Sequence, residues 1–438
     1  MSAEPSNKKS LLHPLWQRIR RLFKKFTRLP ESEAASEEPI DFSAPSVPYY
    51  TNLSERFNLA RIVLYMILLV FVVVTVVSSR HLITYENLYY LVKDINAASL
   101  TAQSQADHLN YPMSGVSADY ALYRGGLTIV GDQEITVLSG SGKQTLSENV
   151  SLASPCVKAG DQYFLTFSRG ERDFSVYNAF VKVHKETTEY PIYDACMARD
   201  GAFAVLTRSK DYTSEVIFYD EDMNKLAAAH LGGFVTAISI SPDGKVLGVL
   251  SLDMAEEDYT SKLTLIKRGI SGVTSRDVIL DGAAALGAGF ISDDRLAVMF
   301  EDRLCIYQSD GGLVKSLPTE DASPLFWACG DGYVAVLSSH PENLSVNILQ
   351  VFDKSGRLAY QTVLDALSGV KGMLLRGQDV YIHLNQRILY ISDKGNQRAE
   401  AVIHRDAAKL LLSESGDLLV CCPAYATRLG SKDFSELP

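Results

Sequence analysis

Hydrophobic residues follow two patterns along this chain. One run at residues 62–79, IVLYMILLVFVVVTVVSS, contains no charged residue. From about residue 119 onward, apolar residues come instead in short runs bounded by turns rich in Gly and Asp. The long run predicts a membrane-spanning helix, because about 20 apolar residues are needed to cross a bilayer. Short runs of four to six apolar residues are typical of strands.

The predicted transmembrane helix covers residues 59–79. A helix over 62–79 is roughly 27 Å long, close to the ~30 Å hydrocarbon layer of a bilayer. Arg61 and Arg80 bracket it and can reach the two interfaces. No small-residue cleavage pattern follows, which favours an uncleaved signal anchor over a signal peptide. Because Lys and Arg are denser before the helix, we expect a single-pass plasma-membrane protein with a cytoplasmic N-terminus and the rest outside the cytoplasm.

Residues 1–58 form the predicted cytoplasmic head, which includes a basic amphipathic segment at residues 11–29. A helix of this kind lies in the headgroup layer, with its apolar side chains inserted and its basic side chains on lipid phosphates. The residues expected to contact anionic lipid are Trp16, Arg18, Arg20, Arg21, Lys24 and Lys25. The alternative is a solvated basic tail whose charges only set the topology. Residues 30–50, rich in Glu, Pro and Ser, are predicted to be a flexible tether.

A short helical stalk is predicted at residues 80–110. Its apolar residues follow spacings of 3, 4, 3 and 4, and they are Leu88, Leu91, Ile95, Ala98 and Ala102. Two heptads are too few to establish a coiled coil. We expect this helix to pack under the next domain, and homo-oligomerisation through the stalk is the alternative.

The remainder, residues 111–438, repeats itself loosely. The segment beginning Tyr123-Arg-Gly-Gly aligns with the one beginning Leu375-Arg-Gly-Gln, and a third copy runs from Ile291 to Gly312. Each unit has a turn, an apolar strand, a polar break, a second strand and a hairpin turn. The inner turns lie at Gly125, Gly160, Gly201, Gly244, Asp294, Gly332, Gly377 and Gly416.

Spacings of 35 to 50 residues between these turns match a four-stranded propeller blade. The predicted fold is therefore an all-β, extracytoplasmic β-propeller, with eight blades favoured and seven as the alternative. The last unit lacks an outermost strand, because the chain ends soon after Leu429. Residues 107–118 can supply that strand and join the two ends of the ring.

The turn Ser241-Pro-Asp-Gly-Lys, after the strand FVTAISI, resembles the inner hairpin of WD40-like and quinoprotein-like propeller blades. The layout of basic head, single span, short helix and propeller is similar to a family of single-span membrane proteins of Gram-positive bacteria whose domain has no established activity. The resemblance implies a propeller fold and a membrane location, and it implies no chemistry.

Charge is distributed unevenly along the chain. Residues 1–80 hold 11 Lys and Arg against 7 Asp and Glu, a net charge of +4, whereas the whole chain has −10. The rest therefore carries −14. An acidic body argues against nucleic-acid binding, and a basic head suits the anionic inner face of a membrane.

The six cysteines have no CxxC spacing, so they do not indicate a zinc site. Cysteine is often a small buried hydrophobe, and filling of the core is the main prediction. Cys156 and Cys196 occupy comparable positions of neighbouring units, which leaves a disulfide between them as the alternative.

No other motif indicates catalysis, a cofactor or a metal. The eight histidines form no HxH or HExxH pair, and the chain has neither GxSxG nor a Gly-rich phosphate loop. The acidic clusters at 220–222, 256–258 and 293–294 lack EF-hand spacing and are expected to be solvated loops. We therefore predict no catalytic, cofactor-binding or metal residue.

Three functions remain in order of preference. The first is a non-enzymatic binding or scaffold module for a protein or cell-envelope partner. The second is a propeller hydrolase or lactonase with its site in the central channel, whose ligands from several blades would not show in sequence spacing. The third is a subunit of a larger membrane complex. Fold alone does not distinguish them.

Overall fold

The computed structural model describes residues 57–58, 61–71, 73–74, 107–112 and 117–437, the last range with short gaps between 256 and 415. The chain divides into two compact units, Met1–Leu88 and Tyr89–Pro438. The predicted head segment 11–29, the tether and residues 80–106 of the predicted stalk lie outside the described residues.

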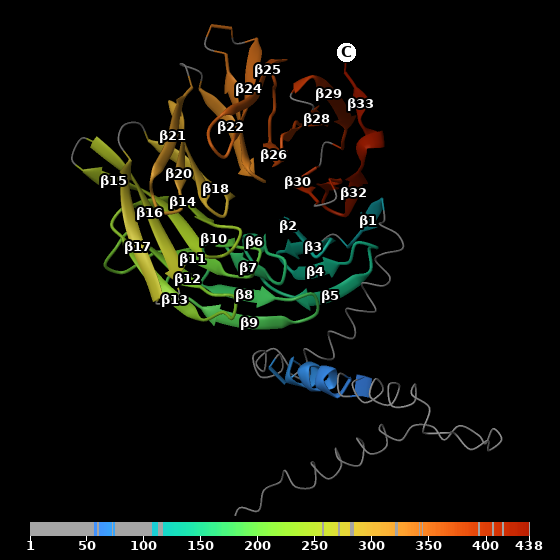
Figure 1. Cartoon of the computed structure of the whole chain (residues 1–438). Coiled ribbons are helices and arrows are strands. Elements are labelled where there is room, and N and C mark those ends of the chain that lie inside the picture. The colour runs from blue at the N-terminus through green and yellow to red at the C-terminus, as the bar shows by residue number, and fades with distance from the viewer. Residues whose placement is uncertain are drawn as a thin grey trace, which may run out of the picture. The chain divides into compact units, whose positions relative to one another are not determined.

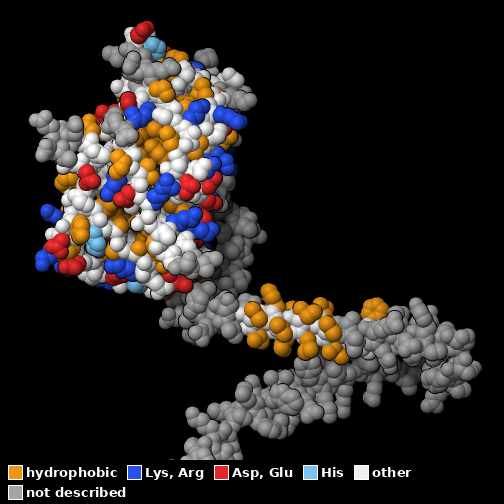
Figure 2. All heavy atoms as spheres, turned by 60° about the vertical axis from the view of Figure 1, so that its left-hand side comes forward, with side chains coloured by type: hydrophobic (Ala, Val, Ile, Leu, Met, Phe, Trp, Pro, Cys, Tyr) orange, Lys and Arg blue, Asp and Glu red, His pale blue; other side chains and the backbone are white. Residues whose placement is uncertain are grey.

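In the first unit, residues 61–71 are helical. Their large apolar side chains are exposed, and Figure 2 shows hydrophobic side chains along this helix. Arg61 donates a hydrogen bond to the Tyr65 hydroxyl one turn later, at 3.2 Å. Within the part of the chain that the structure describes, no helix is both long and apolar enough to cross a membrane. The predicted span 59–79 is itself only partly described.

The second unit is a ring of eight antiparallel sheets, coloured from teal to red in Figure 1. Blade 1 contains β2 (Ala118–Tyr123), β3 (Gly126–Gly131), β4 (Glu134–Leu138) and β5 (Gln144–Asn149). Blade 2 contains β6 (Pro155–Ala159), β7 (Phe164–Ser168), β8 (Asp173–Tyr177) and β9 (Lys182–Thr187). Blade 3 contains β10 (Ile192–Met197), β11 (Phe203–Thr207), β12 (Ser214–Tyr219) and β13 (Lys225–Leu231). Blade 4 contains β14 (Phe234–Ile240), β15 (Val246–Ala255), β16 (Asp258–Gly269) and β17 (Gly272–Leu280).

The second half of the ring follows the same order. Blade 5 contains β18 (Ala285–Ser292), β19 (Arg295–Phe300), β20 (Arg303–Gln308) and β21 (Leu313–Pro318). Blade 6 contains β22 (Pro324–Gly330), β23 (Tyr333–Ser339), β24 (Val346–Asp353) and β25 (Leu358–Asp365). Blade 7 contains β26 (Gly372–Arg376), β27 (Asp379–His383), β28 (Arg387–Ser392), β29 (Gln397–Val402) and a short fifth strand, β33 (Ser435–Glu436). Blade 8 contains β30 (Lys409–Leu412), β31 (Leu418–Cys421), β32 (Tyr425–Leu429) and β1 (His108–Asn110), and a 3-10 turn, η2 (Ser431–Asp433), follows β32.

This architecture confirms the all-β propeller and the eight blades, and the seven-blade alternative is wrong. All eight predicted inner turns lie between the first and second strands of successive blades. Two of them show why a side chain cannot replace glycine. A Cβ on Gly201, at φ +102°, would lie 2.9 Å from the ring of Tyr163 in the preceding blade. A Cβ on Gly244 would lie 2.3 Å from the carboxylate of Asp200, also in the preceding blade.

The predicted closure of the ring is also confirmed, because β1 pairs with β32 as the outermost strand of blade 8. Leu109 of β1 is 1% exposed, and the Tyr111 hydroxyl is shared between the carbonyl oxygens of Cys422 (2.5 Å) and Tyr425 (2.9 Å). The propeller therefore begins at His108, within the range 80–110 that the sequence assigns to the stalk.

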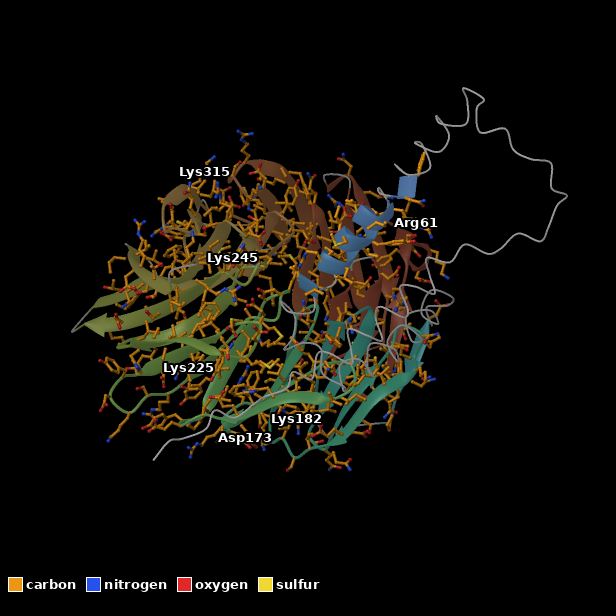
Figure 3. All side chains as sticks on the ribbon, turned by 60° about the horizontal axis from the view of Figure 1, so that its bottom comes forward. Arg61, Asp173, Lys182, Lys225, Lys245 and Lys315 are labelled. Atoms are coloured by element: carbon orange, nitrogen blue, oxygen red, sulfur yellow. The ribbon has the colours of Figure 1, made fainter. Side chains whose placement is uncertain are left out.

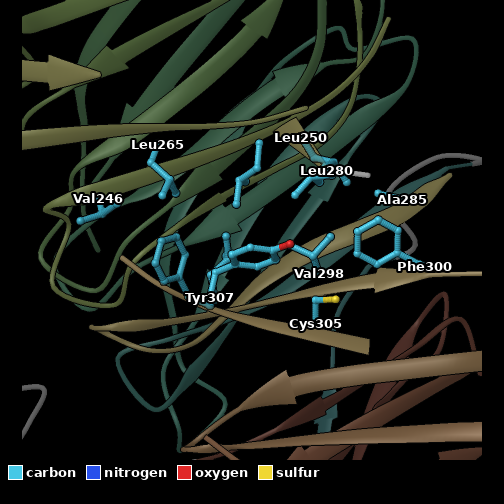
Figure 4. Close-up of a cluster of buried hydrophobic side chains, with 12 residues drawn as sticks. Val246, Leu250, Leu265, Leu280, Ala285, Val298, Phe300, Cys305 and Tyr307 are labelled. Carbon is cyan, nitrogen blue, oxygen red and sulfur yellow. The ribbon is translucent and has the colours of Figure 1, made fainter. Parts of the chain in front are cut away.

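The hydrophobic core of the propeller is divided among the blade interfaces. The described residues form eight buried clusters, each between two neighbouring blades around the ring. Figure 4 shows the one between blades 4 and 5, where Leu250 and Leu265 face Val298 and Tyr307. Each fully buried side chain of this size contributes about 1.5–3 kcal/mol relative to an exposed one. The eight blades are thus held mainly by their neighbours.

Candidate functional site

Four successive blades share an irregularity where the innermost strand begins. In blades 3, 4, 5 and 6 the pairing of the first strand with the second skips one residue, which forms a β-bulge. The skipped residues are Tyr193, Thr236, Leu286 and Leu325, and we call them the bulged rim. The pairings of the innermost strands in blades 7, 8, 1 and 2 show no such shift.

A bulge takes its extra residue out of the ladder and redirects the side chain. At the rim the result is exposure of large apolar groups. Tyr193 is 45% exposed, Leu286 48% and Leu325 46%. Because innermost strands of consecutive blades contact one another, these residues lie along one arc of the channel mouth. The mouth is the one opposite the inner turns.

A groove adjoins the rim at blades 3 and 4. It has a volume of about 850 Å³. Its walls come from β10, from the loop between β11 and β12, and from the segment joining β13 to β14, and the lining residues are Tyr193, Leu206, Arg208, Ser209, Lys210, Asp211, Tyr212, Thr213, Ser214, Gly232, Phe234 and Val235. Tyr212 and Phe234 are exposed, so the groove continues the apolar character of the rim.

Local contacts hold the two loops of this groove together. Thr213 Oγ1 donates to the carbonyl oxygen of Gly232 at 2.5 Å. The ring of Tyr212 stacks on His230, with 5.1 Å between the centroids. A Cβ on Gly233 would lie 2.2 Å from Asp253 Oδ1, so the chain passes β15 at a distance only glycine allows. The groove is therefore built into the blades and does not depend on a partner for its walls.

Ion pairs link the innermost strands from blade 8 round to blade 3. Lys409 of blade 8 and Asp119 of blade 1 form an ion pair at 2.7 Å. Asp119 also accepts a hydrogen bond from the backbone N–H of Val157 in blade 2, at 2.9 Å. In the same way, Lys158 of blade 2 pairs with Asp194 of blade 3 at 3.2 Å. These contacts link four innermost strands and leave each charge with a partner.

The other channel mouth, formed by the inner turns, is crossed by an exposed ion pair. Arg199 in the turn of blade 3 pairs with Asp331 in the turn of blade 6, at 3.7 Å. Those blades are not neighbours in the ring, so this exposed ion pair spans the mouth. Figure 3 labels Lys245, which pairs with Asp243 in the turn of blade 4. Such exposed pairs contribute little to stability.

All six cysteines lie within or against buried clusters, so core filling is confirmed. Cys156 and Cys196 are free thiols, so the alternative disulfide between them is wrong. Burial raises the pKa of the Cys196 and Cys329 thiols to about 12, which keeps them protonated and unreactive.

The acidic clusters serve the turns that contain them. Asp220 accepts from the backbone N–H groups of Asp222 and Asn224, and Glu221 pairs with Arg268 of the next blade. Residues 256–257 lie outside the described residues. In the described part of the chain, no three His, Cys, Asp or Glu side chains are grouped to hold a metal ion.

One buried group has an unusual environment that the sequence did not indicate. His383, at the end of β27, is 5% exposed, and its Nε2 has no hydrogen-bond partner among the residues that the structure describes. Burial, with a smaller contribution from the nearby Lys371, lowers the pKa of His383 to about 4. The imidazole is therefore neutral at physiological pH.

The sequence did not indicate the bulged rim either. The signal available in the sequence is weak: Tyr193, Thr236 and Leu286 each stand eight residues before the inner-turn residue of their blade. Nothing in that spacing reveals that the residue is skipped, because the skip depends on how the second strand pairs.

Comparison with known proteins identifies a family and several distantly similar structures. A search among curated proteins finds no match. Hsv2 of Kluyveromyces lactis is 11% identical with a TM-score of 0.43, covering 74% of this chain and 100% of that one. Apo AztD of Citrobacter koseri is 11% identical with a TM-score of 0.46, covering 68% and 86%. Hydrazine synthase of Kuenenia stuttgartiensis is 13% identical with a TM-score of 0.46, covering 64% and 97%. Such distant likenesses carry no information on function.

The family assignment rests on a match over most of the propeller. A family model matches residues 103–424, from just before the closing strand β1 to the turn that precedes β32. The eight-bladed propeller is thus the family's shared part in this chain. The chain belongs to the Family of unknown function (DUF5711).

Proposed function

We propose that this chain is a membrane-anchored, extracytoplasmic propeller that acts as a binding module for a protein partner, which docks on the bulged rim. The observation that carries the proposal is the rim itself: three large apolar side chains are directed to solvent by bulges at equivalent positions. Exposed apolar patches of this kind mark interaction sites. Bulges near a site commonly serve to aim a side chain.

The arrangement of the exposed apolar residues in the rim differs from that on the rest of the surface. On the face shown in Figure 2, hydrophobic side chains lie in patches among basic and acidic ones. The rim differs because it follows one arc of the channel mouth over four blades. Propeller mouths are concave surfaces on a rigid scaffold, where binding residues are well positioned.

Membrane attachment is the second part of the proposal. It is supported by the uncharged run at 62–79 and by the helical conformation of residues 61–71. The basic segment 11–29 would bind anionic lipid on the cytoplasmic side, and the resemblance noted above extends this to the envelope of a Gram-positive bacterium. The stalk at 80–106 would join the two and is the candidate for self-association.

The docking proposal is tested by photocrosslinking in intact membranes. A benzophenone amino acid at Leu286 or Leu325 should crosslink one recurring protein. The same group at Leu313 or Leu358, which are exposed on the outer strands β21 and β25, should not. Equal labelling from both pairs of sites would rule out docking on the rim.

Topology is tested separately with an impermeant thiol reagent in intact cells. Ser36→Cys should resist labelling, and Ser431→Cys, in the exposed turn after β32, should be labelled. The unmodified chain reports the background from its native thiols, which are buried or only partly exposed. Labelling of Ser36→Cys in intact cells contradicts the orientation.

A further inference from the structure

The groove beside the rim carries two cations without partners in the described structure. Arg208 and Lys210 are exposed in the loop between β11 and β12, and both line the groove. Neither forms an ion pair with a described residue, whereas Lys158, Lys182, Lys409 and Arg268 all do. Asp211 is the only carboxylate among the lining residues. Among the lining residues, two cations thus stand against one carboxylate.

The apolar part of the groove consists of three exposed rings. Tyr193, Tyr212 and Phe234 are 45%, 50% and 63% exposed. Aromatic side chains combined with Arg are characteristic of the residues that dominate binding energy at interfaces. A matching ligand must bring large apolar groups to the rings and negative charge to the cations.

Two kinds of ligand satisfy the charge requirement, an acidic polypeptide and an anionic polysaccharide. The neighbouring rim favours the polypeptide, because Leu286 and Leu325 present branched alkyl groups that bury other apolar side chains well and stack poorly on sugar rings. The net acidity of the propeller does not prevent this. Repulsion from charges farther than about 8 Å is largely screened at physiological ionic strength, so the two near cations outweigh it.

We propose that this groove binds a segment of polypeptide that is acidic and carries large apolar side chains. The inference rests on the proposed docking function and names the chemistry of the partner. The rings and the rim bury the apolar side chains, and Arg208 and Lys210 pair with the carboxylates. Charge then selects the segment, while apolar burial supplies most of the affinity.

The test uses the full chain in detergent and a displayed library of random 12-residue peptides. Enriched peptides should contain Asp or Glu together with Leu, Ile, Phe or Trp. Their synthetic versions should bind about tenfold more weakly to the double variant Arg208→Glu/Lys210→Glu, as expected for two partly screened ion pairs. The matched control is Lys225→Glu/Lys315→Glu, which changes the charge by the same amount on the outer strands β13 and β21 and should bind as the native chain does. Both lysines are labelled in Figure 3.

Each other result has a definite meaning. Enriched peptides that are neutral or basic, or that bind the Arg208→Glu/Lys210→Glu chain unchanged, overturn the proposed partner chemistry. Binding of polygalacturonate in place of any peptide, lost in the same variant, assigns the groove to an anionic polysaccharide and also overturns it. If peptides fail to enrich while rim crosslinks persist, the groove inference fails and the docking proposal stands.

Discussion

The two halves of the propeller ring are built from the same kind of blade, but their innermost strands differ at the channel mouth. Blades 3 to 6 carry a bulge at the start of the innermost strand and direct Tyr193, Leu286 and Leu325 to solvent. Blades 7, 8, 1 and 2 pair without a shift, and Lys409 of blade 8 forms an ion pair with Asp119 of blade 1.

The difference shows that a repeat can be specialised without changing its core. Both halves have the same kind of buried cluster at each interface. One extra residue per innermost strand is enough to convert a packing position into an exposed one. The regular half is therefore expected to contribute to stability at the channel, and the bulged half to binding. Four variants test that division, in order of decreasing effect on stability.

Leu109→Ala should cause the largest loss. Leu109 closes the ring from β1 and is fully buried, so the substitution should lower the free energy of unfolding by about 3 kcal/mol. Urea unfolding followed by circular dichroism measures it. Leu313→Ala, at an exposed position of β21, serves as control and should cost less than about 0.5 kcal/mol. Similar losses in both variants would mean that β1 does not hold blade 8.

His383→Leu should change how stability depends on pH. The folded pKa of His383 is about 4 and the unfolded value about 6.5, so between these values the unfolded chain binds the proton that the folded chain does not. Stability is lost as pH falls through this window. The native chain should lose roughly 2 kcal/mol more than the variant between pH 7 and pH 4.5. Parallel unfolding curves for the two chains would show that His383 titrates normally.

Asp119→Ala should have a moderate effect. It removes both the ion pair with Lys409 and the acceptor for the Val157 N–H, and an expected cost is about 1.5 kcal/mol. Asp293→Ala is the control, because Asp293 is exposed in the turn of blade 5. Thermal unfolding compares the two. A cost no larger than that of the control would contradict the structural role assigned to Asp119.

Leu286→Ser/Leu325→Ser should have the smallest effect on stability. Both side chains are about half exposed, so the double variant should unfold within about 0.5 kcal/mol of the native chain. The double variant should instead lose partner binding, which co-purification measures. A large loss of stability with binding retained would reverse the division between the halves.

The repeat plan was predictable because it is local. Each inner turn combines Gly or Asp with flanking apolar runs, and all eight lie where expected. The closing strand was predictable because the last unit was one strand short. By contrast, the pair between Asp119 and Lys409 joins residues 290 positions apart, and the bulged rim depends on the pairing of two strands. Neither leaves a periodic signal in the sequence.

The pairing of the closing strand β1 with β32 determines where a force on the N-terminal side of the propeller would act first. Strand β1 is three residues long, and residues 89–107 of the same unit precede it in the chain. Any tension along that segment is delivered first to the pairs between His108–Asn110 and Tyr425–Thr427. Peeling of β1 would uncover the outer edge of blade 8 while the other seven blades keep their own strands. The pairs of β1 with β32 are thus the first contacts of the propeller that such a force would break.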